Sequence, residues 1–504
     1  MPTSDKLGHR FHQWRPAAVL LAFIFSTALT AVAEGPTFRW SARMGGNHED
    51  FASDIALDKK GNSYIVGTFR DLAYFDENDD YQMTSRGEAD VFVAKLNRIG
   101  AIEWINQIGG GSDDFARGVA VDTVGNCIVT GSFQSPKAAI LVGEEETKVA
   151  EMIRQADTDI FVTKFDTDGN LLWAKTGGSG PGGSGTAVAT DVEGNVYVTG
   201  YFLGTGLFED LTLNNSGYID IFVARYDPDG ELVWVRQIGG RSDDVAASIK
   251  VDDQGSVFLA GGFSERMQVA RNITLKSEGL FDAFLIKLDS EGRTAWAVAE
   301  GGYMNDIAYG LGIDPAGNIL ISGGYAGSES FGSEFPTHAG YRKPRRRYTR
   351  AYFGRTRLTS EGGSDIFVAK YNPAGKMVWV QSVGGNKKGA AEAGYGLDVD
   401  ARGHAFVTGT FSGRVKFGNN TLISRGVGDI YVMELDRDGR VLWARQAGER
   451  YGAPSIGFNL AVDSRGSSYI TGLYSGNVSF GEHVAKAYGR TDAFIAKVTA
   501  AFIP

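Results

Sequence analysis

Internal repetition limits the fold of this chain more than any other feature of its sequence. Three markers each occur seven times: a tryptophan in an apolar stretch, an Asp-x-x-Gly turn, and an aspartate that precedes an alternating apolar run. They begin at Trp40, Trp104, Trp173, Trp234, Trp296, Trp379 and Trp443; at Asp58, Asp122, Asp191, Asp252, Asp314, Asp400 and Asp463; and at Asp90, Asp159, Asp220, Asp282, Asp365, Asp429 and Asp492. This succession predicts seven copies of one structural unit.

Each copy contains four short strands, here called a, b, c and d, which are clearest in the second copy. They cover residues 117–121, 126–133, 159–165 and 171–175, which are rich in Val, Ile and Phe, and the Asp- and Gly-containing segments 122–126 and 166–170 form hairpin turns. A single four-stranded unit cannot bury both of its faces, so the copies are expected to stack radially. The repeats lack a 3.6-residue period, which excludes a helical solenoid.

The order of the markers predicts how such a ring closes. The repeats begin with a tryptophan strand, 38–43, that has no strand c before it, and they end after the Asp492 strand with no tryptophan strand behind. We therefore predict an all-β, seven-bladed β-propeller of four-stranded antiparallel blades. The N-terminal strand would complete the last blade and remove an exposed edge. One propeller domain would cover residues 34–504.

The repeat unit also resembles a known family. Its pattern runs Gly-Gly-Ser-Asp-Asp-Phe-Ala, then Val-Asp-x-x-Gly-Asn, Thr-Gly-Ser-Phe, Asp-Ile-Phe-Val-x-Lys-x-Asp-x-x-Gly and finally Trp. This pattern is similar to the bacterial SBBP-type β-propeller repeat over residues 37–498. The resemblance implies an exported or cell-surface protein, and it does not imply one activity.

The N-terminus has the composition of a secretory signal peptide, predicted to cover residues 1–33. Basic Lys6, Arg10 and Arg15 precede an apolar run at 17–29, and Ala31 and Ala33 form a small-residue cleavage site. The run is short for a membrane span, although an uncleaved anchor is the alternative. We expect a secreted, periplasmic or cell-surface protein without stable membrane insertion after cleavage.

The formal net charge of −10 argues against a nucleic-acid partner, because such proteins are usually basic. The single cysteine, Cys127, excludes an intramolecular disulfide, and a hydrophobic content of 43% is ample for a core. We expect a monomer.

Binding is expected at the end of the ring that carries the b–c loops and the d–a crossovers, because only these connections vary in length. The long b–c loops are 70–89, 134–158 and 325–364, and the last contains a basic, Tyr-rich insertion. Arginine pairs with carboxylate, sulfate or phosphate, so the insertion favours an anionic polysaccharide, with a solvated loop as the alternative. Its basic residues are Arg342, Lys343, Arg345, Arg346, Arg347, Arg350, Arg355 and Arg357.

Acidic residues occur in several crossovers just before strand a. Carboxylates at Asp50, Asp114, Asp244 and Asp306 could bind Ca²⁺, which takes six to eight oxygen ligands. Because the position recurs in the repeat, the alternative is that each carboxylate caps the amides of its own loop.

Signatures of catalysis are few. The sequence has no Gly-x-Ser-x-Gly elbow and no His-Glu-x-x-His, and the histidines that follow the signal segment are scattered, which predicts no zinc site. We therefore favour a non-enzymatic binding or scaffolding module of the cell envelope, with a protein or an anionic polysaccharide as partner. The alternative is a polysaccharide lyase or hydrolase with carboxylates at the mouth of the channel.

Overall fold

The computed structural model describes residues 35–76, 81–143, 146–327, 349–386, 392–449 and 454–499. These residues form 38 β-strands, and no helix occurs among them, so the predicted all-β class is confirmed. No described segment forms an apolar helix long enough to cross a bilayer. Residues 1–34, which include the predicted signal peptide, lie outside the described ranges.

Each repeat contributes strands a, b and c in the order predicted from the sequence. Strands a are β2 (Phe51–Leu57), β6 (Asp114–Val121), β12 (Gly183–Thr190), β18 (Asp244–Val251), β22 (Asn305–Ile313), β28 (Ala393–Val399) and β34 (Ile456–Val462). Strands b are β3 (Ser63–Tyr74), β7 (Cys127–Phe133), β13 (Val196–Phe202), β19 (Val257–Ala270), β23 (Ile319–Gly327), β29 (Ala405–Phe411) and β35 (Ser468–Tyr474). Strands c are β4 (Gln82–Leu96), β10 (Thr158–Phe165), β16 (Asp220–Tyr226), β20 (Ile273–Leu288), β26 (Asp365–Tyr371), β32 (Asp429–Leu435) and β38 (Asp492–Thr499).

The tryptophan strands d are β1 (Thr37–Gly46), β5 (Ile102–Gly109), β11 (Leu171–Ser179), β17 (Leu232–Gly240), β21 (Thr294–Gly302), β27 (Met377–Val383) and β33 (Val441–Ala447). Within a repeat the strands pair antiparallel in sequence order, as in β6–β7–β10–β11. Each strand a also contacts the strand a of the next repeat, from β2 through β6, β12, β18, β22 and β28 to β34, and β34 contacts β2.

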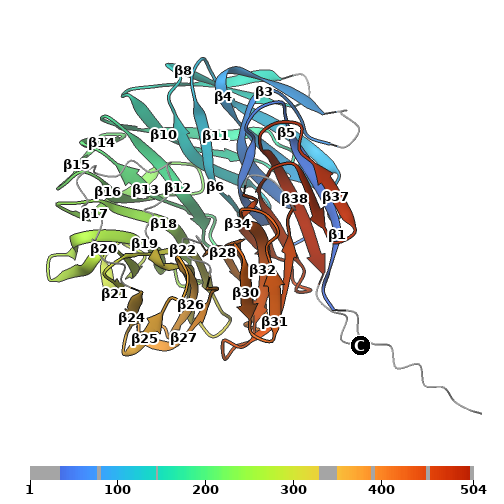
Figure 1. Ribbon diagram of the computed structural model, residues 1–504. Helices are drawn as coiled ribbons and strands as arrows, with labels where there is room; N and C mark the ends of the chain where they lie inside the picture. The colour runs from blue at the N-terminus through green and yellow to red at the C-terminus, as the bar shows by residue number, and fades with distance from the viewer. Residues whose placement is uncertain are drawn as a thin grey trace, which may run out of the picture.

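The first and last strands of the chain pair with each other. Strand β1 runs antiparallel to β38, from Thr37 opposite Thr499 to Met44 opposite Ala493. Figure 1 shows the two lying side by side, although they come from opposite ends of the sequence. This is the pairing that the order of the markers predicts.

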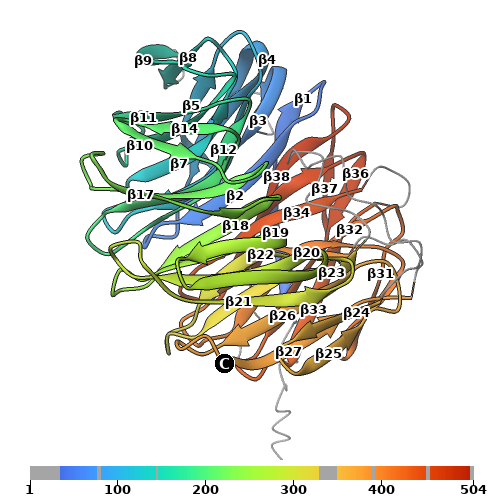
Figure 2. The same cartoon turned by 90° about the vertical axis from the view of Figure 1, so that its left-hand side faces the viewer.

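The b–c segments differ from the expectation of loops, because they form hairpins. They connect strands b and c as predicted, but the described parts of 70–89, 134–158 and 325–364 are largely paired strands. In two repeats the b–c segment is an extension of strands b and c themselves, which are β3 and β4 in one and β19 and β20 in the other. In the other repeats the b–c segment forms a separate short hairpin, and these hairpins can be followed around the molecule in Figure 2. The short hairpins are β8 (Lys137–Val142) with β9 (Thr147–Ile153), β14 (Thr205–Phe208) with β15 (Leu211–Asn214), β24 (Arg350–Phe353) with β25 (Thr356–Thr359), β30 (Arg414–Phe417) with β31 (Asn420–Ile423), and β36 (Asn477–Phe480) with β37 (His483–Lys486).

Several of these b–c segments pair with strand d of the preceding repeat. Strand β8 pairs with β5, where Gly109 lies opposite Ala139, and β24 pairs with β21, where Gly301 lies opposite Tyr352. The hairpins therefore cover edge strands that would otherwise expose unpaired backbone groups.

The hydrophobic core is divided among the spaces between neighbouring sheets. One cluster brings Val66 and Val91 of one repeat together with Val129 and Phe161 of the next. Apart from the extensions of β3, β4, β19 and β20, strands b and c are almost entirely buried, whereas strands d begin with exposed or partly buried residues and become buried toward their ends. Burial between sheets supplies the favourable term that an isolated sheet lacks.

Across most of these spaces a marker tryptophan meets the c–d turn of the next repeat. The Trp104 indole donates a hydrogen bond to the carbonyl of Thr167 in the next repeat at 3.1 Å. Gly169 of the same turn has φ +86°, and a Cβ there would lie 2.9 Å from Cδ2 of Trp104. Only glycine combines this backbone conformation with the close approach of the indole ring.

Candidate functional site

The four acidic residues predicted for Ca²⁺ lie at the crossovers, fully buried, each in its own repeat. Asp114 accepts hydrogen bonds from the amide of Gly110 at 2.9 Å and from the hydroxyl of Ser135 at 2.7 Å. Asp306 accepts from the amides of Gly302 and Ala326, both at 2.8 Å.

Asp50 accepts from the amides of Gly46 at 2.7 Å and Arg70 at 2.9 Å, and Asp244 accepts from the amide of Gly240 at 2.6 Å. The structure thus supports the alternative in which these carboxylates cap loop amides. It does not bring the four together, and a Ca²⁺ site at any of them stays a prediction.

Burial changes the acidity of the crossover carboxyls. Loss of solvation raises the pKa of Asp114 to about 6, against several hydrogen bonds that lower it. It also raises the pKa of Asp90 to about 7, and the charge of Asp114 adds to that increase. Asp114 at the crossover and Asp90 on strand c therefore form a buried pair, and burial favours the protonated form of both.

The basic insertion lies partly outside the described residues, because Arg342, Lys343, Arg345, Arg346 and Arg347 fall in 328–348. The remaining arginines are exposed on the β24–β25 hairpin: Arg350, Arg355 and Arg357. Tyr352, with half of its surface exposed, lies opposite Arg357. This hairpin presents three cations and one aromatic ring to solvent, a combination that suits an anionic partner.

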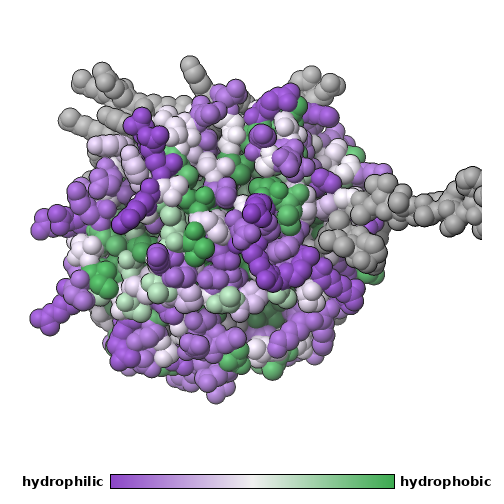
Figure 3. All heavy atoms as spheres, turned by 90° about the horizontal axis from the view of Figure 1, so that it is seen from below, coloured by the Kyte–Doolittle hydropathy of each residue, from purple (hydrophilic) through white to green (hydrophobic). Residues whose placement is uncertain are grey.

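A cavity of about 430 Å³ lies between the seven strands a, which are named the inner strands. Every strand a contributes residues to its wall, and this cavity is named the channel; a second hollow of about 220 Å³ adjoins it beside the Asp-x-x-Gly turns. The volume of the channel, about 430 Å³, lies within the range usual for small-molecule sites. On the face drawn in Figure 3, hydrophobic residues form small groups separated by hydrophilic ones.

The channel wall has an aromatic side. The rings of Tyr309 and Tyr395 are 5.0 Å apart, Phe458 lies 6.4 Å from Tyr395, and Phe51 lies 6.4 Å from Phe458. These rings come from β22, β28, β34 and β2, which are neighbours. At the positions that correspond to Tyr309, Tyr395 and Phe458, β6, β12 and β18 carry Arg117, Thr186 and Ala247, and β2 carries Ser53, so the other side of the wall is cationic or small.

Two carboxyls lie deeper in the channel wall. Asp54 accepts hydrogen bonds from the amides of Ile55 and Val119, both at 2.8 Å, and also from the side chain of Asn459. Asp398 accepts from the amides of Val399 at 2.9 Å and Val462 at 2.8 Å. Each carboxylate thus accepts a hydrogen bond from a backbone amide of the neighbouring inner strand. That amide lies on the edge of its sheet, where no neighbouring strand pairs with it.

Burial raises the pKa of Asp54 to about 6, although its hydrogen bonds and the charge of Lys250 act in the opposite direction. Burial likewise raises the pKa of Asp398, and the charge of Lys250 again opposes it. The channel therefore holds two carboxyls and one ammonium in a partly desolvated space, where electrostatic interactions with a ligand are stronger than in water.

The sequence did not single out these channel residues. Arg117 and Tyr395 occupy ordinary strand positions, and nothing local distinguishes them from core residues. A signal was present in the comparison of repeats, because the residue five positions before the aspartate of each Asp-x-x-Gly turn differs from one copy to the next, whereas the residue before it is always Ala or Gly. The residues that differ are Ser53, Arg117, Thr186, Ala247, Tyr309, Tyr395 and Phe458.

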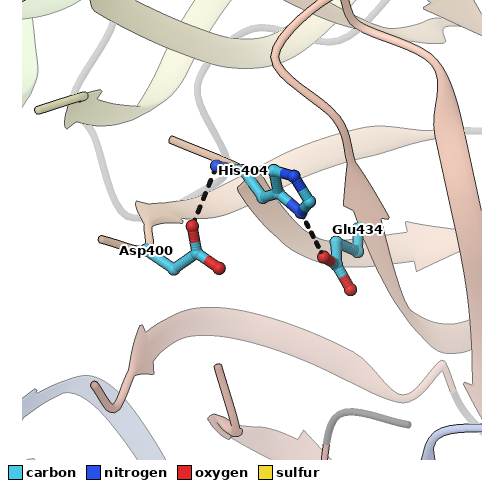
Figure 4. Close-up of side chains that lie close together, drawn as sticks. All are labelled: Asp400, His404 and Glu434. Atoms are coloured by element: carbon cyan, nitrogen blue, oxygen red, sulfur yellow. Dashed lines mark hydrogen bonds and ion pairs between the residues drawn. The ribbon is translucent and has the colours of Figure 1, made fainter. Parts of the chain in front are cut away.

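One group of side chains among the described residues has the composition and spacing of a metal site: Asp400, His404 and Glu434. It lies at the Asp-x-x-Gly turn of the sixth repeat, where Figure 4 shows the imidazole directed at Glu434 with Asp400 beside it. The remaining described histidines, His48 and His483, are on exposed surface.

Comparison with known proteins identifies the repeat. Residues 103–132 match the family model described as SBBP, β-propeller repeat, which confirms the repeat type inferred from the sequence. An uncharacterized WD repeat-containing protein of Acanthamoeba polyphaga mimivirus is 23% identical over 86% of this chain and 36% of its own length. The regulatory protein FlaEY of Caulobacter vibrioides is 27% identical over 27% of this chain and 15% of its own length. The chain thus spans about a third of the first relative and less of the second.

Among solved structures, the WD40 domain of Neurospora crassa Pan2 aligns over 89% of both chains, with 11% identity and a TM-score of 0.41. BamB from Moraxella catarrhalis aligns over 92% of this chain and 99% of its own, with 13% identity and a TM-score of 0.37.

Proposed function

We propose that this β-propeller repeat protein is an exported, seven-bladed binding module whose central channel holds part of an anionic glycan. Seven marker sets, the succession of contacts between inner strands and the pairing of β1 with β38 support a closed ring of seven blades. The signal-peptide pattern of residues 1–33 supports export to the periplasm, the cell surface or the medium.

The asymmetry of the channel wall is the observation that carries the ligand class. Tyr309, Tyr395 and Phe458 line one side of the channel with aromatic rings, a residue type on which the apolar face of a sugar stacks, and Arg117 lies on the other side. A guanidinium pairs well with a carboxylate, so the arrangement suits a uronic acid unit. The exposed arginines of the β24–β25 hairpin would hold further units of the same chain outside the channel.

Titration calorimetry with a uronate oligosaccharide tests this proposal. Tyr395→Ala removes one ring and is expected to weaken binding about tenfold, the loss typical of an aromatic anchor. Tyr352→Ala, an aromatic residue exposed on the hairpin, is the matched control and is expected to have a smaller effect. Equal affinities of the wild type and Tyr395→Ala would place the ligand elsewhere.

Arg117→Gln separates charge recognition from stacking. This variant is expected to weaken binding of the uronate oligosaccharide strongly and to leave binding of the matching neutral oligosaccharide unchanged. Arg440→Gln, in an exposed c–d turn away from the channel and the hairpin, is the control for a general loss of positive charge. Equal losses for the two oligosaccharides in Arg117→Gln would contradict the assignment of Arg117 to the ligand carboxylate.

A second candidate function is cleavage of the same polysaccharide, and the raised pKa of Asp54 in a ligand-sized cavity favours it. Hydrolysis needs one protonated and one ionised carboxyl near the bond that breaks. The hydrogen bonds that Asp54 and Asp398 accept from the neighbouring strands favour binding over catalysis. Appearance of new reducing ends, abolished in Asp54→Asn, would establish the enzyme and displace the binding proposal.

A further inference from the structure

The turn end of each repeat, defined as the end that carries the Asp-x-x-Gly turns, has a recurring ion pair. Lys164 of strand c lies 3.2 Å from Asp122 of its own repeat, and Lys370 lies 2.7 Å from Asp314. The same lysine also donates to a carbonyl in the c–d turn of the next repeat, as Lys164 does to Pro228 at 3.2 Å. The pair thus compensates the buried aspartate and connects two sheets.

The sixth repeat departs from this pattern at two positions at once. Strand c carries Glu434 where the other repeats carry a cation, and the turn carries His404 where they carry Asn or Ser. The equivalent residues are Lys95, Lys164, Arg225, Lys287, Lys370 and Lys497, and Asn62, Asn126, Asn195, Ser256, Asn318 and Ser467. A basic side chain has been replaced by a carboxylate, and an amide or hydroxyl by an imidazole, at the same place.

Part of this change follows from the way the chain ends meet. In the fifth repeat the Trp379 indole donates to the carbonyl of Arg437 in the next c–d turn at 3.0 Å. The strands that would flank the next such turn after the sixth repeat are β38 and β1, which are far apart in sequence and have no hairpin between them. The Trp443 indole donates to Glu434 instead, so this carboxylate replaces the missing carbonyl.

This role uses one oxygen of Glu434 and leaves the other directed at the turn. Oε1 of Glu434 lies 2.6 Å from Nδ1 of His404, and a ligand atom from each of Asp400, His404 and Glu434 falls within 4.8 Å of the others. The side chains of Asp400 and Glu434 are 3% and 5% exposed, and that of His404 is 20% exposed. The group is therefore buried at its base and open to solvent on the His404 side.

Neighbouring donors orient these side chains as the outer shell of a metal site does. Trp443 holds Glu434, and Oδ1 of Asp400 accepts from the amides of Arg402 and His404 at 2.8 and 2.9 Å. The guanidinium of Arg402 lies 2.7 Å from Asp400 and 3.3 Å from Glu434, and its side chain is 48% exposed. A half-exposed cation thus lies between the two carboxylates.

We propose that Asp400, His404 and Glu434 form a binding site for one divalent metal ion of the Zn²⁺ class. One imidazole and two carboxylates are ligands that zinc and its neighbours accept, with water in the remaining position, whereas Ca²⁺ prefers oxygen alone. The Arg402 side chain would swing into solvent when the ion enters. The absence of a His-Glu-x-x-His motif does not bear on this site, because its ligands come from a turn and a separate strand.

Competition with a chromophoric chelator on the full chain measures Zn²⁺ binding, and Co²⁺ reports the ligands through its visible spectrum. We expect one ion per chain with strong affinity. His404→Asn introduces the residue found in four other repeats, and Glu434→Gln keeps an acceptor for Trp443 while removing the anionic ligand. Each is expected to weaken binding at least about 100-fold, because loss of an outer-shell partner alone costs 10–100-fold.

Two further variants keep the test decisive. Arg402→Gln removes the competing cation without touching a ligand and is expected to raise the affinity for Zn²⁺. His483→Asn, on exposed surface, is the control for adventitious binding and is expected to leave affinity unchanged. The proposal is overturned if the wild type binds no ion, or if folded His404→Asn and Glu434→Gln bind Zn²⁺ as the wild type does.

Discussion

The two ends of each sheet both bury a repeated aspartate, and they stabilise it in opposite ways. At the turn end of the fifth repeat, Asp314 is paired with Lys370 at 2.7 Å, and both side chains are less than 10% exposed. At the other end, the crossover end that carries the d–a connections, Asp282 and Asp306 lie near one another and accept hydrogen bonds from backbone amides.

This difference appears in the acidity of the two ends. Burial alone would raise the pKa of Asp314, but hydrogen bonds from Lys370 and Asn318 outweigh it and hold the pKa below its usual value. Burial raises the pKa of Asp282 to about 7, and the charges of Glu278 and Glu300 add to the increase. The same residue type is therefore held as an anion at one end and favoured as a neutral acid at the other.

Loss of a turn-end lysine is expected to have the largest effect on stability. Lys370→Met leaves the buried carboxylate of Asp314 without its cation, which should lower the free energy of unfolding by about 3–5 kcal/mol. Lys287→Met is the matched control, because Lys287 lies 3.9 Å from Asp252 and the two side chains are 19% and 21% exposed. Urea unfolding followed by tryptophan fluorescence measures both, and equal losses would show that burial of the pair does not matter.

A methyl group added at the crossover end is expected to lower the free energy of unfolding by an intermediate amount. A Cβ at Gly109 would lie 2.1 Å from Cγ of Asp90, so Gly109→Ala must displace a buried carboxyl and should cost about 1–3 kcal/mol. A Cβ at Gly111, two residues later in the same crossover, would meet nothing within 4 Å. Gly111→Ala should therefore stay within about 0.5 kcal/mol of the wild type in the same urea experiment.

The sequence predicted those features that repeat. Trp104 and Gly169 have counterparts in most repeats, because an indole and a turn that admits it fill most of the spaces between sheets, so the count of tryptophans indicates the architecture. The short hairpins cannot be told from loops in the sequence, because strands of four residues, such as Thr205–Phe208, are too short for a periodic pattern. Their pairing depends on strand d of another repeat, which is not visible locally.

The candidate sites depend on features that do not repeat. Tyr395 resembles a core aromatic until the structure places it on the channel wall, and His404 and Glu434 are 30 residues apart in sequence. Alignment of the seven copies against each other would have marked both Glu434 and His404 as exceptions. It would not have shown that they meet, because that requires the register between the turn and strand c.

The crossover acids also predict how stability depends on pH. A carboxyl whose pKa is raised to about 6 or 7, as in Asp114 and Asp282, keeps its proton in the folded chain after the unfolded chain has lost it near pH 4. The folded state then binds more protons, so this contribution to stability is present below pH 4 and is lost as the pH rises through 6 to 7. Asp314, with a lowered pKa, contributes above pH 4 and loses its contribution as the pH falls below that value.

Among these variants, Asp244→Asn is expected to change the melting temperature least, but the direction of that change is the clearest. Oδ1 of Asp244 and Oδ1 of Asp220 are buried without a hydrogen-bond partner in the described structure, and burial together with the charge of Asp220 raises the pKa of Asp244 well above normal. The amide cannot ionise, so the variant should melt at a higher temperature than the wild type at pH 8 and at a similar temperature at pH 4. Asp314→Asn, at the turn end, should instead melt lower at pH 8, because it loses the pair with Lys370. If both variants change the melting temperature in the same direction at pH 8, the two ends do not differ in the way their pKa values indicate.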